Sequence, residues 1–347
     1  MRYKLLGKSG LRVSEICLGA MTFGEDWGWG ASGKESRAMY DVFREAGGNF
    51  IDTANIYTNG SSEALLGDFM YGHRDSIVLA TKFSNSIVMG DPNAGGNNRK
   101  AMMREVEASL KRLKTDYIDL YWQHIWDQLT PVEEVLRGFE DLVKSGKVLY
   151  IGISDAPAWY VARANTLAEL RGWTQFVGLQ IEYSLIERTP EHELLPMARE
   201  LGITVTPWSP LAGGILAGKY LDMETDEAKA GRYGSEQMQG ALAAERDRKT
   251  RIAQEVVRVA AEIGVSASQV ALAWIRHRDP TMIPIIGTRK LSQLNDNLAS
   301  LDVRLSPDQM LRLNEISRIE PIFPGSFFQK EFVPKYVYGD LRDKIDV

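Results

Sequence analysis

The chain has 347 residues, 44% of them hydrophobic and 25% charged, and its formal net charge is −5 at pH 7. This balance is typical of a globular protein with an ample core, and the interspersed charges argue against a nucleic acid or an anionic membrane as a partner. The single cysteine, Cys17, excludes an internal disulfide framework and agrees with a reducing compartment.

The first predicted element is a β-hairpin within residues 3–14, where two short strands flank the segment from Gly7 to Gly10. Strand and helix patterns alternate after it. We predict strands at 16–20, 49–53, 76–81, 117–122, 148–153, 176–181, 203–207 and 282–286. We predict helices at 35–47, 62–70, 99–114, 132–145, 157–169, 191–201, 248–262 and 290–299. This repeat of strand–helix units indicates an α/β fold, a single (β/α)8 TIM barrel across residues 1–347.

Local signals support several boundaries. Thr130 followed by Pro131 predicts a helix start, because proline is favoured at the first helical position. Residues 266–276 add a helix before the last strand. Two segments fall outside the repeat, a long loop at 209–247 and a C-terminal extension at 306–347. Loops of such length in a compact domain are usually functional or mobile.

Neither a membrane anchor nor a metal site is expected. No 18 apolar residues run without interruption, and the start of the chain lacks a signal-peptide pattern, so we expect a cytoplasmic protein. The four histidines, His73, His124, His192 and His277, show no metal-ligand spacing.

Four polar residues follow three consecutive predicted strands: Asp52, Tyr57, Lys82 and His124. Each has a simpler explanation when it is taken alone, such as a helix cap, a surface side chain, a structural ion pair or a local hydrogen bond. Together they match the way in which a parallel barrel assembles a catalytic site, with side chains delivered from the C-terminal ends of successive strands.

At these residues the chain resembles the aldo-keto reductase superfamily, whose catalytic tetrad would fall on Asp52, Tyr57, Lys82 and His124 in the same order. The stretches Leu18–Gly24 and Ser145–Val148 look closest to the longer branch of that superfamily, which includes potassium-channel β-subunits and microbial aryl-alcohol dehydrogenases. The resemblance covers about residues 3 to 320. It implies a barrel enzyme that reduces carbonyls.

The chemistry of the tetrad agrees with carbonyl reduction, which needs a hydride at carbon and a proton on oxygen. A tyrosine with an ordinary pKa of about 10 is a weak acid, so we expect the Lys82 ammonium to lower the pKa of Tyr57. Asp52 would pair with Lys82, and His124 would donate to the substrate oxygen. Tyr57 would then be the proton donor.

None of these four side chains can carry a hydride, so a cofactor is required. The resemblance implies NADP (NADPH), with NAD as an alternative. It places the nicotinamide near Ser154, Gln180 and Trp208, and the adenosine 2′-phosphate near Thr288, Arg289 and Gln293. The cofactor-binding residues carried over from the family motifs are Gly19, Ala20, Met21, Ser154, Gln180, Trp208, Ser209, Pro210, Leu211, Gly213, Lys219, Gly287, Thr288, Arg289, Gln293 and Asn297.

Three positions depart from the family pattern. Asp155 replaces an Asn that holds the nicotinamide carboxamide, and an Asp cannot donate, so a direct contact from Asp155 is not expected. Gly287 stands where the family often has Lys, and Asp296 where it often has Glu. The departures at Gly287 and Asp296 weaken the expected preference for NADP over NAD without reversing it.

The physiological substrate cannot be read from the sequence. Trp27, Trp29 and Trp126 are expected in loops near the barrel opening, which suggests a pocket for aryl or polycyclic carbonyls, although exposed aromatics also suit an oligomer contact. Two alternatives to a carbonyl reductase stay open. One is a cofactor-sensing regulatory subunit, and the other is a reductase or dehydrogenase of a specialised sugar or polycyclic metabolite. The oligomeric state is not predicted.

A different nucleotide motif also has to be weighed. Gly28, Gly30 and Gly33 match G-x-G-x-x-G, and Asp52 follows at a suitable distance, as in a Rossmann fold. That motif requires the first glycine to follow a strand directly, whereas residues 23–27 intervene here. We therefore predict a loop at 28–33 instead of a dinucleotide site.

Overall fold

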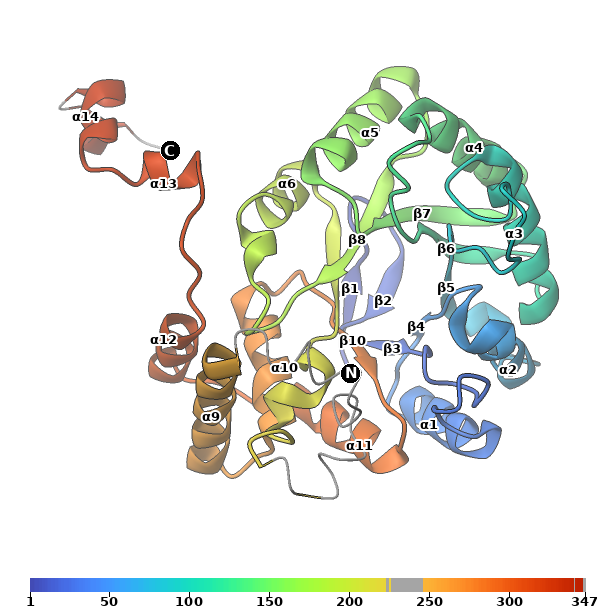
Figure 1. Cartoon of the computed structure of the whole chain (residues 1–347), viewed down its shortest axis with the longest axis horizontal. Coiled ribbons are helices and arrows are strands. Elements are labelled where there is room, and N and C mark those ends of the chain that lie inside the picture. The colour runs from blue at the N-terminus through green and yellow to red at the C-terminus, as the bar shows by residue number, and fades with distance from the viewer. Residues whose placement is uncertain (223–224, 226–245, 340, 346–347) are drawn as a thin grey trace.

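Eight parallel strands form a barrel ringed by helices in the computed structural model, which describes residues 1–222, 225, 246–339 and 341–345 (Figure 1). The strands are neighbours in the order in which they follow along the chain, as expected for repeated strand–helix units. They are β3 (Cys17–Gly19), β4 (Phe50–Asp52), β5 (Val78–Phe83), β6 (Ile118–Gln123), β7 (Val148–Ser154), β8 (Phe176–Glu182), β9 (Thr204–Trp208) and β10 (Ile285–Gly287).

The ring closes between the last strands. β10 pairs with β3 in parallel, and just before β10 the Ile283 N–H donates to the Val205 carbonyl of β9 at 3.0 Å. Because this bond joins the two ends of the sheet, the (β/α)8 barrel is confirmed and an open doubly wound sheet is excluded.

Helices cover the outside of the barrel. Those of the repeat are α1 (Gly33–Glu45), α2 (Ser61–Phe69), α3 (Arg99–Leu113), α4 (Val132–Lys144), α5 (Ala158–Arg171), α6 (Leu194–Leu201), α9 (Arg246–Ile263), α10 (Ala267–Arg278) and α11 (Leu291–Ala299). In the described part of the chain no single helix is long and apolar enough to cross a membrane. The pair α9 and α10 reaches that length and hydropathy only together, across a bend of 98°.

Trp122 fills the barrel interior and determines what its neighbours can be. The indole is fully buried in an apolar cluster with residues from β4, β5 and β10. A Cβ on Gly152 would lie 2.3 Å from Trp122 Cε3, and one on Gly178 would lie 2.7 Å from Trp122 Cη2. The two glycines of β7 and β8 are therefore required for space and not for an unusual backbone conformation.

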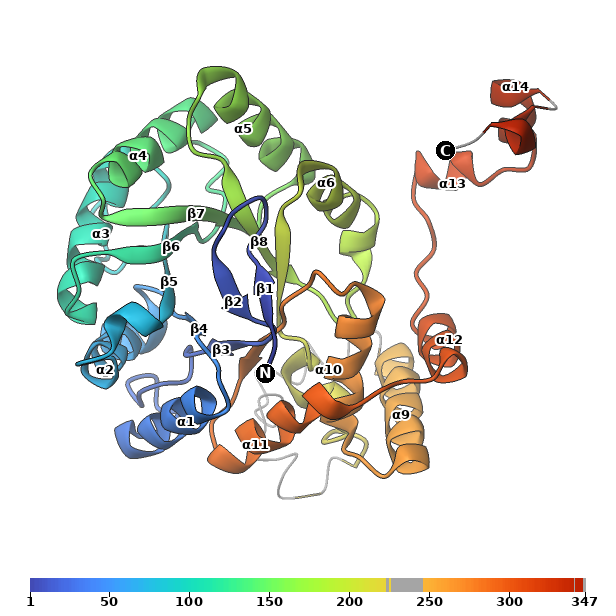
Figure 2. The same cartoon turned by 180° about the vertical axis from the view of Figure 1, so that it is seen from behind.

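The predicted hairpin closes the end of the barrel where the strands begin. It consists of β1 (Tyr3–Leu5) and β2 (Arg12–Ser14), which pair with each other and lie outside the eight-stranded sheet (Figure 2). Leu6 and Val13 belong to the interior cluster, and the Gly7 N–H donates to Thr204 Oγ1 at 2.7 Å. The hairpin thus leaves the opposite end, here called the mouth, as the place for a site.

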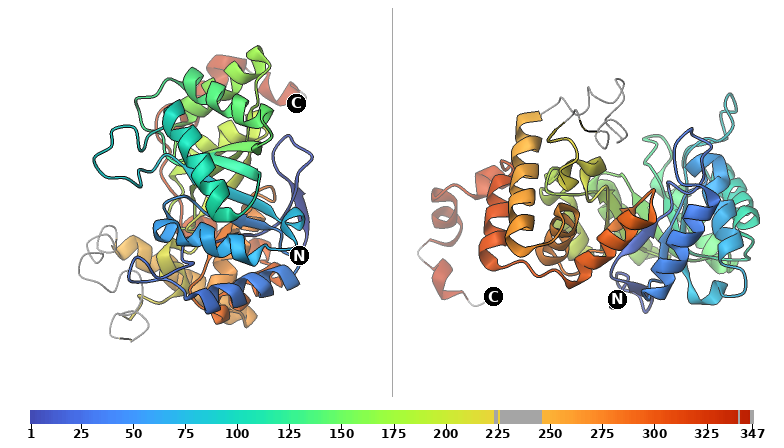
Figure 3. Two further views of the ribbon diagram at one scale, coloured as in Figure 1. Left: turned by 90° about the vertical axis from the view of Figure 1, so that its right-hand side faces the viewer. Right: turned by 90° about the horizontal axis from the view of Figure 1, so that it is seen from below.

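The C-terminal extension contains helices that we did not predict. α12 (Pro307–Ile316) begins with a capping box formed by Ser306 and Gln309, and it packs on α9. Beyond it the chain extends away from the barrel and forms two short helices, α13 (Gly325–Phe328) and α14 (Phe332–Tyr338) (Figure 3). The long loop predicted at 209–247 lies largely outside the described residues, which resume at Arg246.

The segment that contains Gly28 and Gly30 is a loop, as predicted, but Gly33 is already the first residue of α1. It leaves β3 at Gly19 and folds back on itself through bridges between Phe23, Gly24 and Ala31 before α1 begins. The phosphate turn of a Rossmann fold is therefore absent at this position.

Candidate active site

The four residues of the tetrad meet at the mouth because their strands end there. Asp52 is the last residue of β4, Lys82 is the penultimate residue of β5, and His124 directly follows β6. Tyr57 begins a short 3-10 helix, η1 (Tyr57–Gly60), in the loop after β4. Parallel pairing in register brings these ends to one edge of the sheet.

Lys82 is the centre of the tetrad. Its Nζ donates to Asp52 Oδ2 at 2.5 Å, to the Thr53 carbonyl at 2.8 Å and to the Tyr57 hydroxyl at 3.1 Å. Asp52 is held from its other side by Gln180, whose Nε2 donates to Asp52 Oδ1 at 3.0 Å. The buried ammonium thus has an acceptor for each of its three protons, which offsets the cost of burying it.

The protonation states of Lys82 and Tyr57 depend on their burial and on the charges beside them. Burial lowers the pKa of Lys82, but the Asp52 carboxylate and the Tyr57 hydroxyl together outweigh it, so the pKa is raised and Lys82 stays charged. Burial raises the pKa of Tyr57, and the Lys82 ammonium opposes this shift without reversing it. The expected net decrease in the pKa of Tyr57 is therefore wrong. In this structure desolvation of the phenol exceeds the charge effect, so Tyr57 is fully protonated at neutral pH.

His124 is oriented by a residue that the sequence analysis missed. Asn85 Nδ2 lies 2.7 Å from His124 Nδ1, and since an amide NH2 can only donate, Nδ1 is the acceptor. Burial, together with the Lys82 charge, lowers the pKa of His124 well below its ordinary value, so the ring is neutral. Its proton is then on Nε2, the nitrogen that can donate to a ligand. The only sequence signal for Asn85 is its position three residues after Lys82.

Beside the tetrad, the ends of β7, β8 and β9 bring Ser154, Gln180 and Trp208 together, as predicted. The Ser154 hydroxyl is buried. Desolvation raises the pKa of the adjacent Asp155 carboxyl, and the Ser154 hydroxyl only opposes this shift, since it makes no hydrogen bond of ordinary geometry. Trp208 donates from Nε1 to Asp155 Oδ1 at 3.1 Å. Asp155 therefore contacts the tryptophan of this group.

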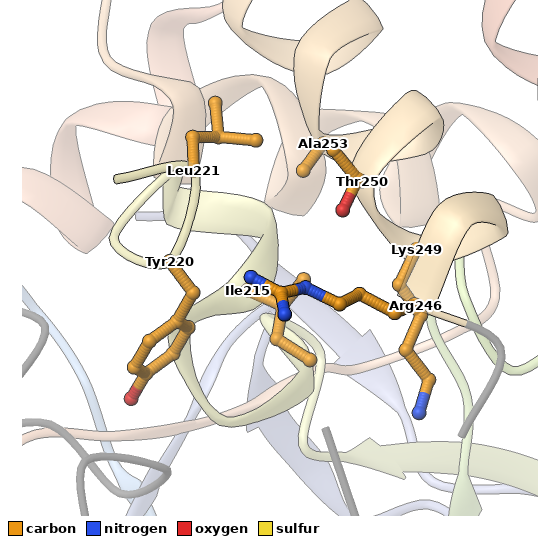
Figure 4. Close-up of a pocket in the computed structure, with 7 residues that line it drawn as sticks. All are labelled: Ile215, Tyr220, Leu221, Arg246, Lys249, Thr250 and Ala253. Carbon is orange, nitrogen blue, oxygen red and sulfur yellow. The ribbon is translucent and has the colours of Figure 1, made fainter. Parts of the chain in front are cut away.

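The turn after β9 is built from unusual backbone conformations. Ser209 and Ala212 have φ of 49°, and Gly213 and Gly214 have φ of 64° and 99°. Such turns point successive N–H groups to one side, which suits an anion. Further along, a cavity of about 10 Å³ lies between this segment and α9, with Ile215 and Tyr220 among its lining residues (Figure 4). It holds one water at most.

The predicted phosphate site lies at the start of α11, where two backbone donors already have acceptors. The Arg289 N–H donates to Gln293 Oε1 at 3.0 Å, and the Leu291 N–H donates to Glu35 Oε1 at 2.6 Å. The Thr288 side chain is buried, whereas a Cβ on Gly287 would meet open space. A side chain at position 287 would therefore project freely beside Arg289.

Asn297 and Asp296 lie further along α11. Asn297 is buried, so its side chain lies on the face of α11 that packs against the rest of the protein. Asp296 instead accepts from Ser266 Oγ at 2.9 Å and from Gln269 Nε2 at 2.7 Å, at the start of α10. Its carboxylate thus joins two helices. Gly19 is the last residue of β3, and Ala20 and Met21 follow it in the first loop. Next to them, Thr22 Oγ1 donates to the Thr288 carbonyl at 2.6 Å.

Two groups of aromatic side chains flank the mouth. In the first, the Trp27 ring lies 5.6 Å from Trp29 and 6.4 Å from Tyr57. In the second, Trp126 lies 5.5 Å from Trp159 and 5.6 Å from Tyr160. The structure thus brings Trp27 to the tetrad, while Trp126 belongs to a separate cluster on α5. Among the described residues no group of His, Cys, Asp or Glu could hold a metal ion.

Comparison with known proteins gives one family. Residues 15–318 match the model of the aldo/keto reductase family. An aryl-alcohol dehydrogenase (NADP(+)) of Phanerodontia chrysosporium is 40% identical over 337 residues, covering 92% of this chain and 86% of that protein. A norsolorinic acid reductase of Emericella nidulans is 38% identical over 94% of this chain and 84% of that protein. An uncharacterized oxidoreductase of Bacillus subtilis is 39% identical over 94% and 97%.

Proposed function

The chain belongs to the aldo/keto reductase family and is an oxidoreductase, and from that premise we propose that it reduces aldehyde or ketone carbonyls to alcohols with NADPH, with Tyr57 as the proton donor. The observation that carries the proposal is the contact of the buried Lys82 ammonium with both Asp52 and the Tyr57 hydroxyl. The proposed substrate is a small-molecule carbonyl compound.

The residues present fit a nicotinamide cofactor. The buried Ser154 hydroxyl lacks a hydrogen bond, and such a group calls for a polar ligand. Gln180 uses its Nε2 on Asp52, which leaves its side-chain oxygen for a carboxamide N–H. Trp208 would offer the ring a flat face, and Ser209, Leu211 and Gly213 would line the pyrophosphate. When it is bound, the cofactor supplies the hydride.

NADPH is proposed over NADH because of Arg289. A guanidinium pairs strongly with a phosphate, and only NADPH carries one at the 2′ position. One of the relatives is named for NADP(+), which agrees with this choice. The Glu35 carboxylate at the start of α11 works against it, since it already accepts from the Leu291 N–H. The preference therefore rests on the Arg289 side chain more than on the helix N-terminus.

The protein side chains have distinct roles in the proposed reaction. His124 would orient the substrate oxygen by donating from Nε2, and it would stabilise the negative charge that develops on that oxygen. Tyr57 would donate its proton to the same oxygen. Lys82 would stabilise the resulting phenolate at 3.1 Å, while Asp52 keeps Lys82 in place. A neutral His124 and a protonated Tyr57 are the forms that reduction requires.

An aromatic carbonyl is the proposed substrate class. Trp27 and Trp29 lie on the side of the mouth next to Tyr57, and they would stack on a planar ring. Two of the relatives are named for an aryl alcohol and for norsolorinic acid.

The test is reduction of a panel of benzaldehydes by wild type and by Tyr57→Phe, with NADPH consumption as the signal. We expect a fall in turnover of ~10²–10⁴-fold, the usual cost of losing a placed acid, with an unchanged dissociation constant for NADPH. Tyr71→Phe is the matched control because Tyr71 is exposed in the turn that follows α2, outside the loops that carry the tetrad. Near-full turnover by Tyr57→Phe would remove Tyr57 from its role. Cofactor binding by wild type without turnover of any carbonyl would favour a cofactor-sensing subunit.

A further inference from the structure

Asp155 lies at the proposed nicotinamide site without a role in the reaction described above. It directly follows β7, and its φ of 43° is in the left-handed region, which Asp tolerates better than most residues. Its N–H donates to the Gln180 carbonyl at 3.2 Å, and its own carbonyl accepts from the Trp126 N–H at 3.4 Å. The backbone of Asp155 is therefore fixed between β8 and the loop after β6.

The Asp155 carboxylate is directed at Trp208. Oδ1 accepts from the indole Nε1 at 3.1 Å, and this bond links the end of β7 to the end of β9 across β8. Trp208 has one donor, so the bond fixes the rotation of the indole plane. Any flat ring that stacks on Trp208 would take its orientation, and its distance from the carboxylate, from this contact.

Among the described residues the Asp155 carboxylate has no direct ion-pair partner, and the Lys82 charge acts on it only from a distance. Within the described ranges of the chain no lysine, arginine or histidine forms an ion pair with Asp155, whereas Lys82 is paired with Asp52. The Asp155 charge reaches the tetrad: burial raises the pKa of Tyr57 most, Lys82 opposes this shift, and the charges of Asp52 and, more weakly, Asp155 add to it. In the described part of the chain, the site therefore has a negative charge without a direct ion-pair partner close to the ring-binding face.

We infer that Asp155 determines the preference of this protein for the oxidised over the reduced cofactor, by holding Trp208 in orientation and by placing a negative charge beside the nicotinamide ring. The inference rests on the proposed function, which puts the ring at Trp208. The oxidised nicotinamide ring is positively charged and the reduced ring is neutral, so a nearby carboxylate attracts only the oxidised form. Asp155 is a specificity-determining residue in this role and takes no part in proton transfer.

The experiment is calorimetric titration of NADP⁺ and NADPH at about pH 8 into wild type and Asp155→Asn. Asn keeps a side-chain oxygen for the Trp208 N–H and removes the charge. We expect the dissociation constant for NADP⁺ to rise at least about fivefold, the effect of one charge pair about 4 Å apart at the dielectric constant of water, and more if the pair is less well solvated. The constant for NADPH should stay nearly unchanged.

Salt and a control variant separate charge from shape. Because Asp155 is exposed, the difference between wild type and Asp155→Asn should shrink as salt rises from about 0.1 M to about 1 M. Glu169→Gln removes the same charge from an exposed position near the end of α5 and should change neither constant. Trp208→Phe loses the hydrogen bond but keeps the carboxylate, so it should weaken both cofactors.

The outcomes are distinct. An equal change for NADP⁺ and NADPH in Asp155→Asn would overturn the inference, and so would an effect of Glu169→Gln on NADP⁺ of the same size. A salt-independent difference would also contradict it. If wild type binds neither cofactor, the proposed function fails instead, before the role of Asp155 is reached.

Discussion

Asn85 determines which nitrogen of His124 carries the proton, and this gives a prediction about catalysis. Asn85→Ala removes the donor to Nδ1, so the neutral ring can adopt either tautomer and part of the population no longer donates from Nε2. We expect turnover to fall roughly tenfold or more, within the ~10²–10³-fold cost of losing a whole donor, while cofactor affinity is kept. Nitrogen NMR of His124 should show the mixed tautomers. Asn93→Ala, in an exposed loop, should behave like wild type; an unchanged tautomer would contradict the role of Asn85.

Arg289 and Gly287 give a second prediction at the same scale. Arg289→Ala should raise the dissociation constant for NADPH roughly ten- to hundredfold, the equivalent of a lost charge-assisted bond, and should hardly affect NADH. Gly287→Lys should lower the dissociation constant for NADPH and hardly affect that for NADH, since a side chain at 287 meets open space beside Arg289. Fluorescence titration of both cofactors measures the two effects. If Arg289→Ala weakens NADH and NADPH equally, Arg289 does not bind the 2′-phosphate.

At the scale of elements, the packing of β6 against β7 and β8 predicts the effect of a single methyl group. Gly152→Ala puts a Cβ 2.3 Å from Trp122, inside a barrel whose other side chains leave no room for the indole to move. Overpacking of this kind typically costs ~1–3 kcal/mol of unfolding free energy. The midpoint of urea unfolding measures it. Gly10→Ala is the control, because nothing lies within 4 Å of a Cβ there, and equal stability of the two variants would refute the packing argument.

At the scale of the whole molecule, Glu191 predicts how stability depends on pH. It accepts from Tyr183 at 2.6 Å, from Arg188 at 2.8 Å and from Arg278 at 3.1 Å, and so joins the loop after β8 to α10. Burial raises the pKa of Glu191, but these donors outweigh it and hold the pKa at about 2, below the ordinary 4.5. Because the pKa of Glu191 is lower in the folded protein, the carboxylate stabilises the fold at pH values above about 4.5. This stabilisation is lost as the pH falls toward about 2, the pKa in the folded protein.

The variant Glu191→Gln tests this dependence. At pH 7 it should lower the unfolding free energy by about 1–3 kcal/mol, because the arginines lose a charged acceptor and one of its two oxygens becomes an NH2 group. The difference from wild type should shrink as pH falls from about 4.5 to about 2, the window between the two pKa values. Urea unfolding at several pH values measures it. Glu193→Gln, at an exposed position nearby, should show no such trend; a constant deficit for Glu191→Gln would contradict the assignment.

The barrel could be predicted from the sequence because each strand–helix unit is a local pattern. β4 to β9 lie within two residues of the predicted strands, and Asp52, Lys82 and His124 follow from strand ends alone. The start of α12 also has a local signal, formed by Ser306, Pro307 and Gln309, although residues 306–347 were predicted only as an extension. Contacts between residues distant in sequence could not be predicted from the sequence. Asn85 on His124, Glu35 on α11 and the desolvation of Tyr57 depend on how the loops pack over the mouth.

The packing of Trp122 against Gly152 and Gly178 also constrains how these three positions can evolve. While the indole is present, a side chain at either glycine collides with it, so neither glycine can be exchanged first at low cost. Loss of the tryptophan instead leaves a cavity, which a later alanine at 152 or 178 fills in part. Either first step is costly, because overpacking by one alanine costs ~1–3 kcal/mol and truncation of a buried tryptophan ~3–5 kcal/mol, so the three positions are expected to change together.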